Sequence, residues 1–155
     1  MSLETLIDQY ATGPRLLRQA VAGMTRQQVT ARPIAGKWST LEVVCHIADF
    51  EPIYADRTKR ALAEENPLIM SGDPDLFQRK LAYDARDLEE ELTLIEAVRR
   101  QMVRIMKQLP AADFQRTARH SEDGPITIET LLTRITNHIP HHLTFIAEKR
   151  QALGI

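Results

Sequence analysis

His46, His138 and His142 are the residues whose types and spacing in this sequence could bind a metal ion together. His138 and His142 are four positions apart, so on an α-helix they lie about one turn apart on the same face. His46 lies much earlier in the chain, in another strongly apolar stretch with helical character. Three imidazoles that converge from two helices would form an open metal site, which leaves coordination positions free for water or a substrate.

Helical periodicity separates His138 and His142, which follow an apolar stripe, from His141, which falls on a more polar side of the same helix. Cys45 points about 100° away from His46 around its helix, so we interpret it as a small buried hydrophobic residue. A lone histidine on an apolar helix is most often a core residue. The pattern alone therefore leaves both interpretations open, a metal site and a set of buried core histidines.

Two carboxylates, Glu42 and Asp49, share a helical stripe with His46. Ligating imidazoles usually donate their other N–H group to a carboxylate or a carbonyl, so either residue could accept that hydrogen bond or become a fourth ligand. Each residue also has a simpler interpretation. Glu42 forms a predicted capping box with Ser39, in the pattern Ser-x-x-Glu, and Asp49 could pair with a nearby arginine.

Four long helices must position these side chains. Helical periodicity predicts them at residues 3–24, 39–64, 87–109 and 127–152. Gly13-Pro14 predicts a kink in the first helix or its division into two pieces. A loop is expected at 30–38, a second capping box at Asp87 and Glu90, and a short helix at 76–82 in the long connection. Strand signals are weak throughout, so the expected fold is an all-α four-helix bundle with long crossover connections.

The composition is that of one ordinary globular domain spanning residues 1–155. Hydrophobic residues make up 43% of the chain, and 20 basic residues are mixed with 21 acidic ones. This balance gives no electrostatic reason to expect nucleic acid or an acidic membrane as a partner. A single cysteine excludes an internal disulfide and fits a reducing compartment. Because neither a signal peptide nor a transmembrane segment is expected, the predicted location is the cytoplasm.

Two segments of the chain resemble motifs of the DinB/YfiT-like superfamily. Its G-K-W-S-x-x-E-x-x-x-H-x-x-D segment is similar to P-I-A-G-K-W-S-T-L-E-V-V-C-H-I-A-D-F-E, which contains Glu42, His46 and Asp49. Its closing H-x-x-x-H helix is similar to N-H-I-P-H-H-L-T-F-I-A-E-K-R. The resemblance covers almost the whole chain, because Gly13-Pro14 and the segment G-P-I-T-I-E-T-L-L also match the pattern.

The resemblance implies an up-down-down-up bundle and a homodimer. It also implies a divalent metal ion, nickel or zinc, held by His46, His138 and His142. Members of known activity include thiol-dependent S-transferases and a maleylpyruvate isomerase that use low-molecular-weight thiols, and many others are only provisionally named metal-dependent hydrolases.

We therefore expect a metal-dependent enzyme that acts on a small-molecule substrate. The ion would activate either a thiol, as in a transferase, or water, as in a hydrolase. The alternative is a non-enzymatic module that binds a metal or a small molecule, or an interaction protein with vestigial histidines. An open coordination position favours an enzyme, whereas a fourth protein ligand favours a structural site.

Overall fold

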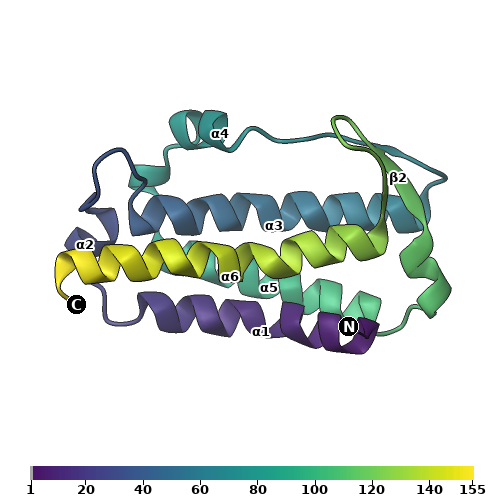
Figure 1. Cartoon of the computed structure of the whole chain (residues 1–155), viewed down its shortest axis with the longest axis horizontal. Helices are drawn as coiled ribbons and strands as arrows, with labels where there is room; N and C mark the ends of the chain where they lie inside the picture. Colours follow the sequence, from purple (N-terminus) through teal and green to yellow (C-terminus); the bar gives the residue numbers. More distant parts are fainter. Residues whose placement is uncertain (1) are drawn as a thin grey trace.

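Four long helices form the body of the protein in a computed structural model, which describes residues 2–155 (Figure 1). They are α1 (Leu3–Val21), α3 (Thr40–Ala63), α5 (Leu88–Met106) and α6 (Ile128–Leu153). Helices α1 and α6 run toward one end of the molecule, and α3 and α5 run toward the other. The expected four-helix bundle with up-down-down-up topology is therefore confirmed.

Each long helix packs against two others. Helix α1 packs against α5 and α6, and α3 packs against the same two helices. The histidine-bearing helices α3 and α6 are thus direct neighbours. The core between them is apolar, as the burial of Val44, Ile47 and Ile139 shows. Removal of these side chains from water holds the two helices together and sets their spacing.

The start of α3 is fixed by the predicted capping box. Ser39 Oγ accepts a hydrogen bond from the N–H of Glu42, and Glu42 Oε2 accepts one from the N–H of Ser39, at 3.1 and 2.7 Å. At the second predicted box only half of the pattern forms. Asp87 accepts hydrogen bonds from the N–H groups of Glu89 and Glu90, but the Glu90 side chain returns no bond within residues 2–155. Asp87 is therefore a simple N-cap.

The first predicted helix is continuous through Gly13 and Pro14, so its division into two pieces was wrong. Between the first predicted helix and the predicted loop, the chain forms a short helix, α2 (Arg26–Thr30), which the sequence pattern did not indicate. Thr25 and Gln28 form the capping box that starts it. Five residues are too few to show an apolar periodicity, which explains why α2 was missed.

The crossover from α3 to α5 returns the chain along the outside of α3 (Figure 1). It contains β1 (Leu68–Ile69), helix α4 (Pro74–Lys80) and a 3-10 turn, η1 (Tyr83–Ala85). Helix α4 corresponds to the short helix predicted at 76–82. It begins two residues earlier because Asp73 caps it and Pro74 occupies its first turn.

A small sheet closes the end of the bundle where α3 stops, and the sequence did not predict it. A second 3-10 turn, η2 (Ala111–Gln115), precedes strands β2 (Thr117–His120) and β3 (Gly124–Thr127), which pair antiparallel. Strand β1 pairs parallel to β2. The strands have only two or four residues, too few for a clear alternation, and they bury Ile69, Ala118 and Ile126 against the bundle.

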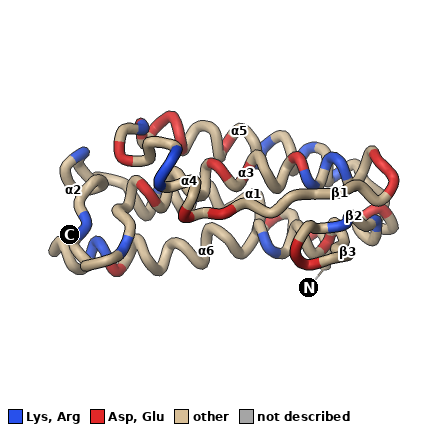
Figure 2. Tube along the Cα trace, turned by 90° about the horizontal axis from the view of Figure 1, so that it is seen from above, with Lys and Arg blue, Asp and Glu red and all other residues tan. Residues whose placement is uncertain are grey.

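The surface carries charges of both signs along the whole molecule (Figure 2). Blue basic and red acidic positions are interspersed on the helices and the crossover in that view. No helix within residues 2–155 is long and apolar enough to cross a membrane.

Candidate metal centre

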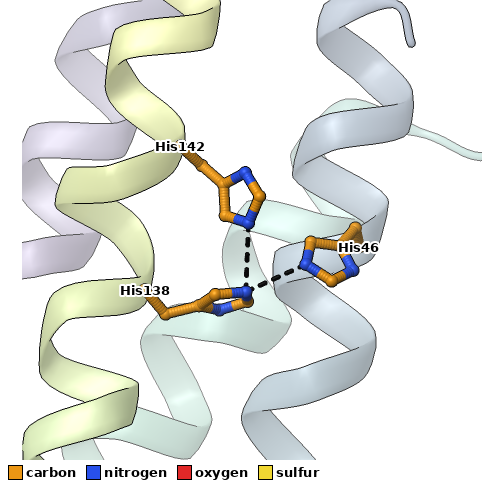
Figure 3. A group of neighbouring side chains, drawn as sticks. All are labelled: His46, His138 and His142. Carbon is orange, nitrogen blue, oxygen red and sulfur yellow. Dashed lines mark hydrogen bonds between the residues drawn. The ribbon is translucent and has the colours of Figure 1, made fainter. Parts of the chain in front are cut away.

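The three histidines lie together in the space between α3 and α6. The Nε2 atom of His138 is 2.9 Å from that of His46 and 3.1 Å from that of His142 (Figure 3). Within residues 2–155 they form the one group of histidine, cysteine or acidic side chains with the spacing of metal ligands. Nitrogen ligands of one ion at about 2.1 Å lie about 3.0 to 3.4 Å apart, so this triangle fits a metal ion after small adjustments.

Burial keeps all three imidazoles neutral at physiological pH. Desolvation lowers the pKa of His46 to about 4, that of His142 to about 3 and that of His138 to about 2. For His138, the neighbouring rings of His46 and His142 lower the pKa further. A neutral imidazole has a free lone pair, which metal coordination requires.

The Nδ1 atoms of the three rings have no hydrogen-bond partner within residues 2–155. In His46, His138 and His142 alike, the Nε2 atom is the one that faces the other rings. An Nε2-ligating imidazole carries its proton on Nδ1. The ring orientations therefore indicate that Nε2 is the ligand atom in each case.

Glu42 and Asp49 are occupied elsewhere, and neither is hydrogen-bonded to His46. Glu42 accepts hydrogen bonds from the Ser39 N–H, from Arg32 and from Gln78. The carboxylate of Asp49 pairs with Arg86 at 2.9 Å. The charge of Asp49 still raises the pKa of His46, against the larger opposite effect of burial. Both carboxylates therefore lie outside the group of potential ligands.

Aromatic side chains surround the histidines and limit the access of water. The ring of His46 lies 5.5 Å from that of Trp38 and 4.7 Å from that of Phe50, measured between centroids. Phe77 of α4 packs on Phe50 at 5.8 Å, so the crossover covers this side of the site. A dry environment strengthens the electrostatic interactions inside it.

His141 and Cys45 lie outside the group. His141 is exposed, and its ring contacts His142 from the outer side at a centroid distance of 5.1 Å. Cys45 is fully buried, and its Sγ donates to the carbonyl of Tyr83. Burial raises the pKa of the Cys45 thiol to about 12, so it is not a ready nucleophile.

A cavity adjoins the histidines, and apart from His142 the sequence analysis did not assign its lining residues to the site. It has a volume of about 230 Å³, and Trp38, His142, Phe145 and Lys149 contribute to its lining. Lys149 lies seven positions after His142, two turns further along the same helix face. That spacing could have placed Lys149 beside His142. The sequence of α6 alone, however, did not show that the opposite wall of the cavity comes from the loop before α3.

Comparison with known proteins gives one consistent result. Residues 9–146 match the family model described as the DinB superfamily. A protein of Oceanobacillus iheyensis is 32% identical over 140 residues, which cover 90% of this chain and 81% of the relative. YfiT of Bacillus subtilis is 28% identical over 142 residues, which cover 91% of this chain and 80% of YfiT. Both are provisionally named metal-dependent hydrolases.

A solved structure of YfiT superposes with a TM-score of 0.91 at 27% sequence identity. The match covers 99% of this chain and 90% of that chain. The solved protein is described as having an unusual four-helix bundle topology, and this chain also forms a four-helix bundle (Figure 1).

Proposed function

The chain belongs to the DinB superfamily, and on that premise we propose that it is a metal-dependent enzyme in which His46, His138 and His142 hold a divalent ion. The observation that carries the proposal is the meeting of three neutral Nε2 atoms from two helices. Imidazole donors suit zinc and nickel, and these are the ions we propose.

Three neutral ligands leave the full charge of a divalent ion in place. The ion would supply a nucleophile at neutral pH by lowering the pKa of a bound thiol or water molecule. The same ligands serve both nucleophiles, so we propose either transfer of a small thiol or hydrolysis. The provisional names of the relatives favour hydrolysis, and the resemblance to thiol-dependent S-transferases favours thiol transfer.

The side chains around the histidines support an enzyme more than a structural metal site. The ligand group contains three residues and no fourth protein ligand within residues 2–155, which leaves coordination positions for other molecules. The adjoining cavity gives a small-molecule substrate a place next to His142. Because the Cys45 thiol is buried and protonated, we propose that the nucleophile comes from outside the chain.

Removal and return of the metal test this proposal. The purified protein is analysed for bound elements, stripped with a chelator, and assayed for thiol transfer to electrophiles and for ester and amide hydrolysis. We expect activity to disappear with the metal and to return with zinc, nickel or manganese. Activity that survives complete removal of the metal would contradict the proposal.

A non-enzymatic metal-binding module is the alternative. It predicts bound metal without turnover of thiols, esters or amides under any metal. The homodimer implied by the family resemblance is also a proposal, and sedimentation equilibrium of the metal-loaded protein would measure the oligomeric state directly.

A further inference from the structure

The cavity beside His142 lies between the loop that precedes α3 and the last turns of α6. Trp38 and Val43 form one wall, and His142, Phe145 and Lys149 form the other. His142 belongs both to the lining of this cavity and to the histidine group. The ring of Trp38, which also lines the cavity, contacts His46. A molecule in this space therefore lies next to the proposed metal ligands.

Lys149 is the unusual residue in this lining, because its side chain is only 3% exposed. Its Nζ atom donates one hydrogen bond, to the carbonyl of Phe145 at 3.1 Å, and lies over the Phe145 ring at 5.9 Å. An ammonium group has three donors. Within residues 2–155 it forms no ion pair, whereas buried Arg99 is paired with Glu51.

A buried ammonium group without a counterion is costly, since burial disfavours its charged form. Desolvation lowers the pKa of Lys149. The negative charge of Glu148 offsets part of this effect, and the positive charge of Lys37 adds to it. An anion beside Nζ would supply the missing partner and would favour the charged form of Lys149 against the effect of burial. The structure thus contains half of an ion pair at the wall of a cavity.

The other charges at this cavity do not fill that position. Lys37 and Glu148 both contribute to the lining, but both are exposed to solvent. Glu148 is adjacent to Lys149 in the chain, yet its carboxylate does not pair with Nζ. The remaining lining is mainly apolar and aromatic, which suits an organic group better than a small inorganic anion.

We propose that this cavity binds the carboxylate of a small organic acid, with Lys149 as its ion-pair partner and Trp38 and Phe145 around its apolar part. The inference rests on the proposed function, because the acid would be the substrate, or part of the substrate, of the metal site. A volume of about 230 Å³ restricts the bound part to a small group.

Trp38 offers a direct readout, since it is the only tryptophan in the chain and lines the cavity. Phenylacetate and phenylacetamide are the probes, because they have similar shapes and differ in charge. We expect phenylacetate to change the Trp38 fluorescence in a saturable manner and to bind about tenfold more tightly than the amide, as one charge-assisted hydrogen bond predicts. Equal affinities would overturn the proposal without any substitution in the protein.

Substitution of Lys149 tests its role. Lys149→Met retains the length and apolar stem of the side chain without the charge, so it should remove the preference for the acid and leave amide binding unchanged. Lys37→Met is the matched control at the exposed side of the same cavity, and it should retain most of the preference. Circular dichroism and thermal melting establish that both variants fold. An undiminished preference in folded Lys149→Met would overturn the proposal.

The same titration in metal-free and metal-loaded protein separates this inference from the proposed function. In metal-free protein the acid preference should persist, because it depends on Lys149 and not on the ion. In protein loaded with manganese, the paramagnetic ion should broaden the proton signals of bound phenylacetate. Lys149-dependent binding without bound metal or activity would overturn the proposed function and support the carboxylate site. If active, metal-loaded protein showed no preference for the acid, the carboxylate site would be overturned and the proposed function would be supported.

Discussion

Arg99 Nη1 donates a hydrogen bond to the main-chain carbonyl of Tyr10 at 2.8 Å, across the interface between α5 and α1. Tyr10 is four residues before Pro14, which has no N–H group to give to that carbonyl. Arg99 therefore supplies the partner that the proline removes. Its other nitrogens donate to Glu51 of α3 and to the carbonyl of Ile135 in α6.

One buried guanidinium thus connects all four long helices. Ile135 lies one turn before His138 on α6, and Glu51 lies five residues after His46 on α3. These hydrogen bonds fix the position of α6 along its axis relative to α3. This axial position determines whether the imidazoles meet. The precise placement of the histidine triangle therefore depends on residues outside it.

Arg99→Met should destabilise the protein by about 3 to 5 kcal/mol, since it leaves the buried Glu51 carboxylate without its counterion. Chemical denaturation monitored by circular dichroism measures the change. Arg100→Met is the matched control, because Arg100 is adjacent and exposed, and it should change stability little. Similar midpoints for the two variants would show that the buried ion pair contributes little to stability.

Gly13→Ala should also destabilise the protein, by about 1 to 3 kcal/mol, because it overpacks the same cluster. A Cβ atom at Gly13 would overlap Arg99 Nη1 and would lie 3.2 Å from Ile139 Cδ1. In a helix with free space, the same change usually stabilises by about 0.5 to 1 kcal/mol. The sign of the effect in thermal melting is thus diagnostic. A stabilised Gly13→Ala variant would mean that Arg99 can move aside.

Local features of the chain were predictable because they depend on helix geometry and nearby residues. The common face of His138 and His142 follows from their spacing, and the capping box of Ser39 with Glu42 follows from a three-residue pattern. The hydrogen bond from Arg99 to the carbonyl of Tyr10 was not predictable, because it joins two helices that are far apart in the sequence. The sequence indicated that Asp49 could pair with an arginine, and the structure confirms this, but the sequence did not identify Arg86, which lies 37 positions later in the crossover.

The remaining unpredicted features depend on connecting segments that fold back onto the bundle. Strand β1 has two residues, and its parallel pairing with β2 exists only because the crossover passes β2. Lys149 is an ordinary polar position in the pattern of α6, and its burial depends on the loop that carries Trp38. Periodicity gives the face on which a residue lies, but the neighbour that covers this face is set by the tertiary fold.

Glu42 should make stability depend on acid pH. Burial acts to raise the pKa of Glu42, but hydrogen bonds from Arg32 and the Ser39 N–H outweigh it and hold the pKa below its ordinary value. In acid, Glu42 of the unfolded chain therefore binds a proton more readily than Glu42 of the folded chain. The contribution of Glu42 is complete above the ordinary glutamate pKa and is lost as the pH falls through the lower folded value.

Glu42→Gln tests this dependence by keeping a capping side chain that does not titrate. The variant should lose less stability than the parent protein between neutral and acid pH in denaturant titrations. Glu42→Ala, which cannot cap, should cost on the order of 1 kcal/mol at neutral pH. Glu65→Gln, at an exposed position, should follow the parent. Parallel pH curves for Glu42→Gln and the parent would refute the predicted shift.

Cys45 should react slowly with iodoacetamide in the native protein. Because burial raises its pKa to about 12, its thiolate fraction at neutral pH is roughly a thousandfold below that of an unperturbed thiol. Mass spectrometry of timed samples measures the reaction, and protein unfolded in urea provides the fast reference. Cys45→Ala should also retain metal-dependent activity. Rapid native labelling, or loss of activity in a metal-loaded Cys45→Ala variant, would make the thiol a candidate nucleophile.

Metal binding should stabilise the protein through His142 but not through the adjacent His141. A ligand that binds only the folded state adds about 2.7 kcal/mol when its free concentration is one hundred times its dissociation constant. Zinc or nickel should therefore raise the melting temperature of the parent protein, and a chelator should reverse the increase.

In His142→Ala one of the three convergent Nε2 atoms is missing, so both the increase and stoichiometric binding should be lost. His141→Ala should retain both, because its exposed ring lies outside the ligand group. Elemental analysis and melting curves of the two variants decide the matter, and equal losses would show that the ligands on α6 are wrongly assigned.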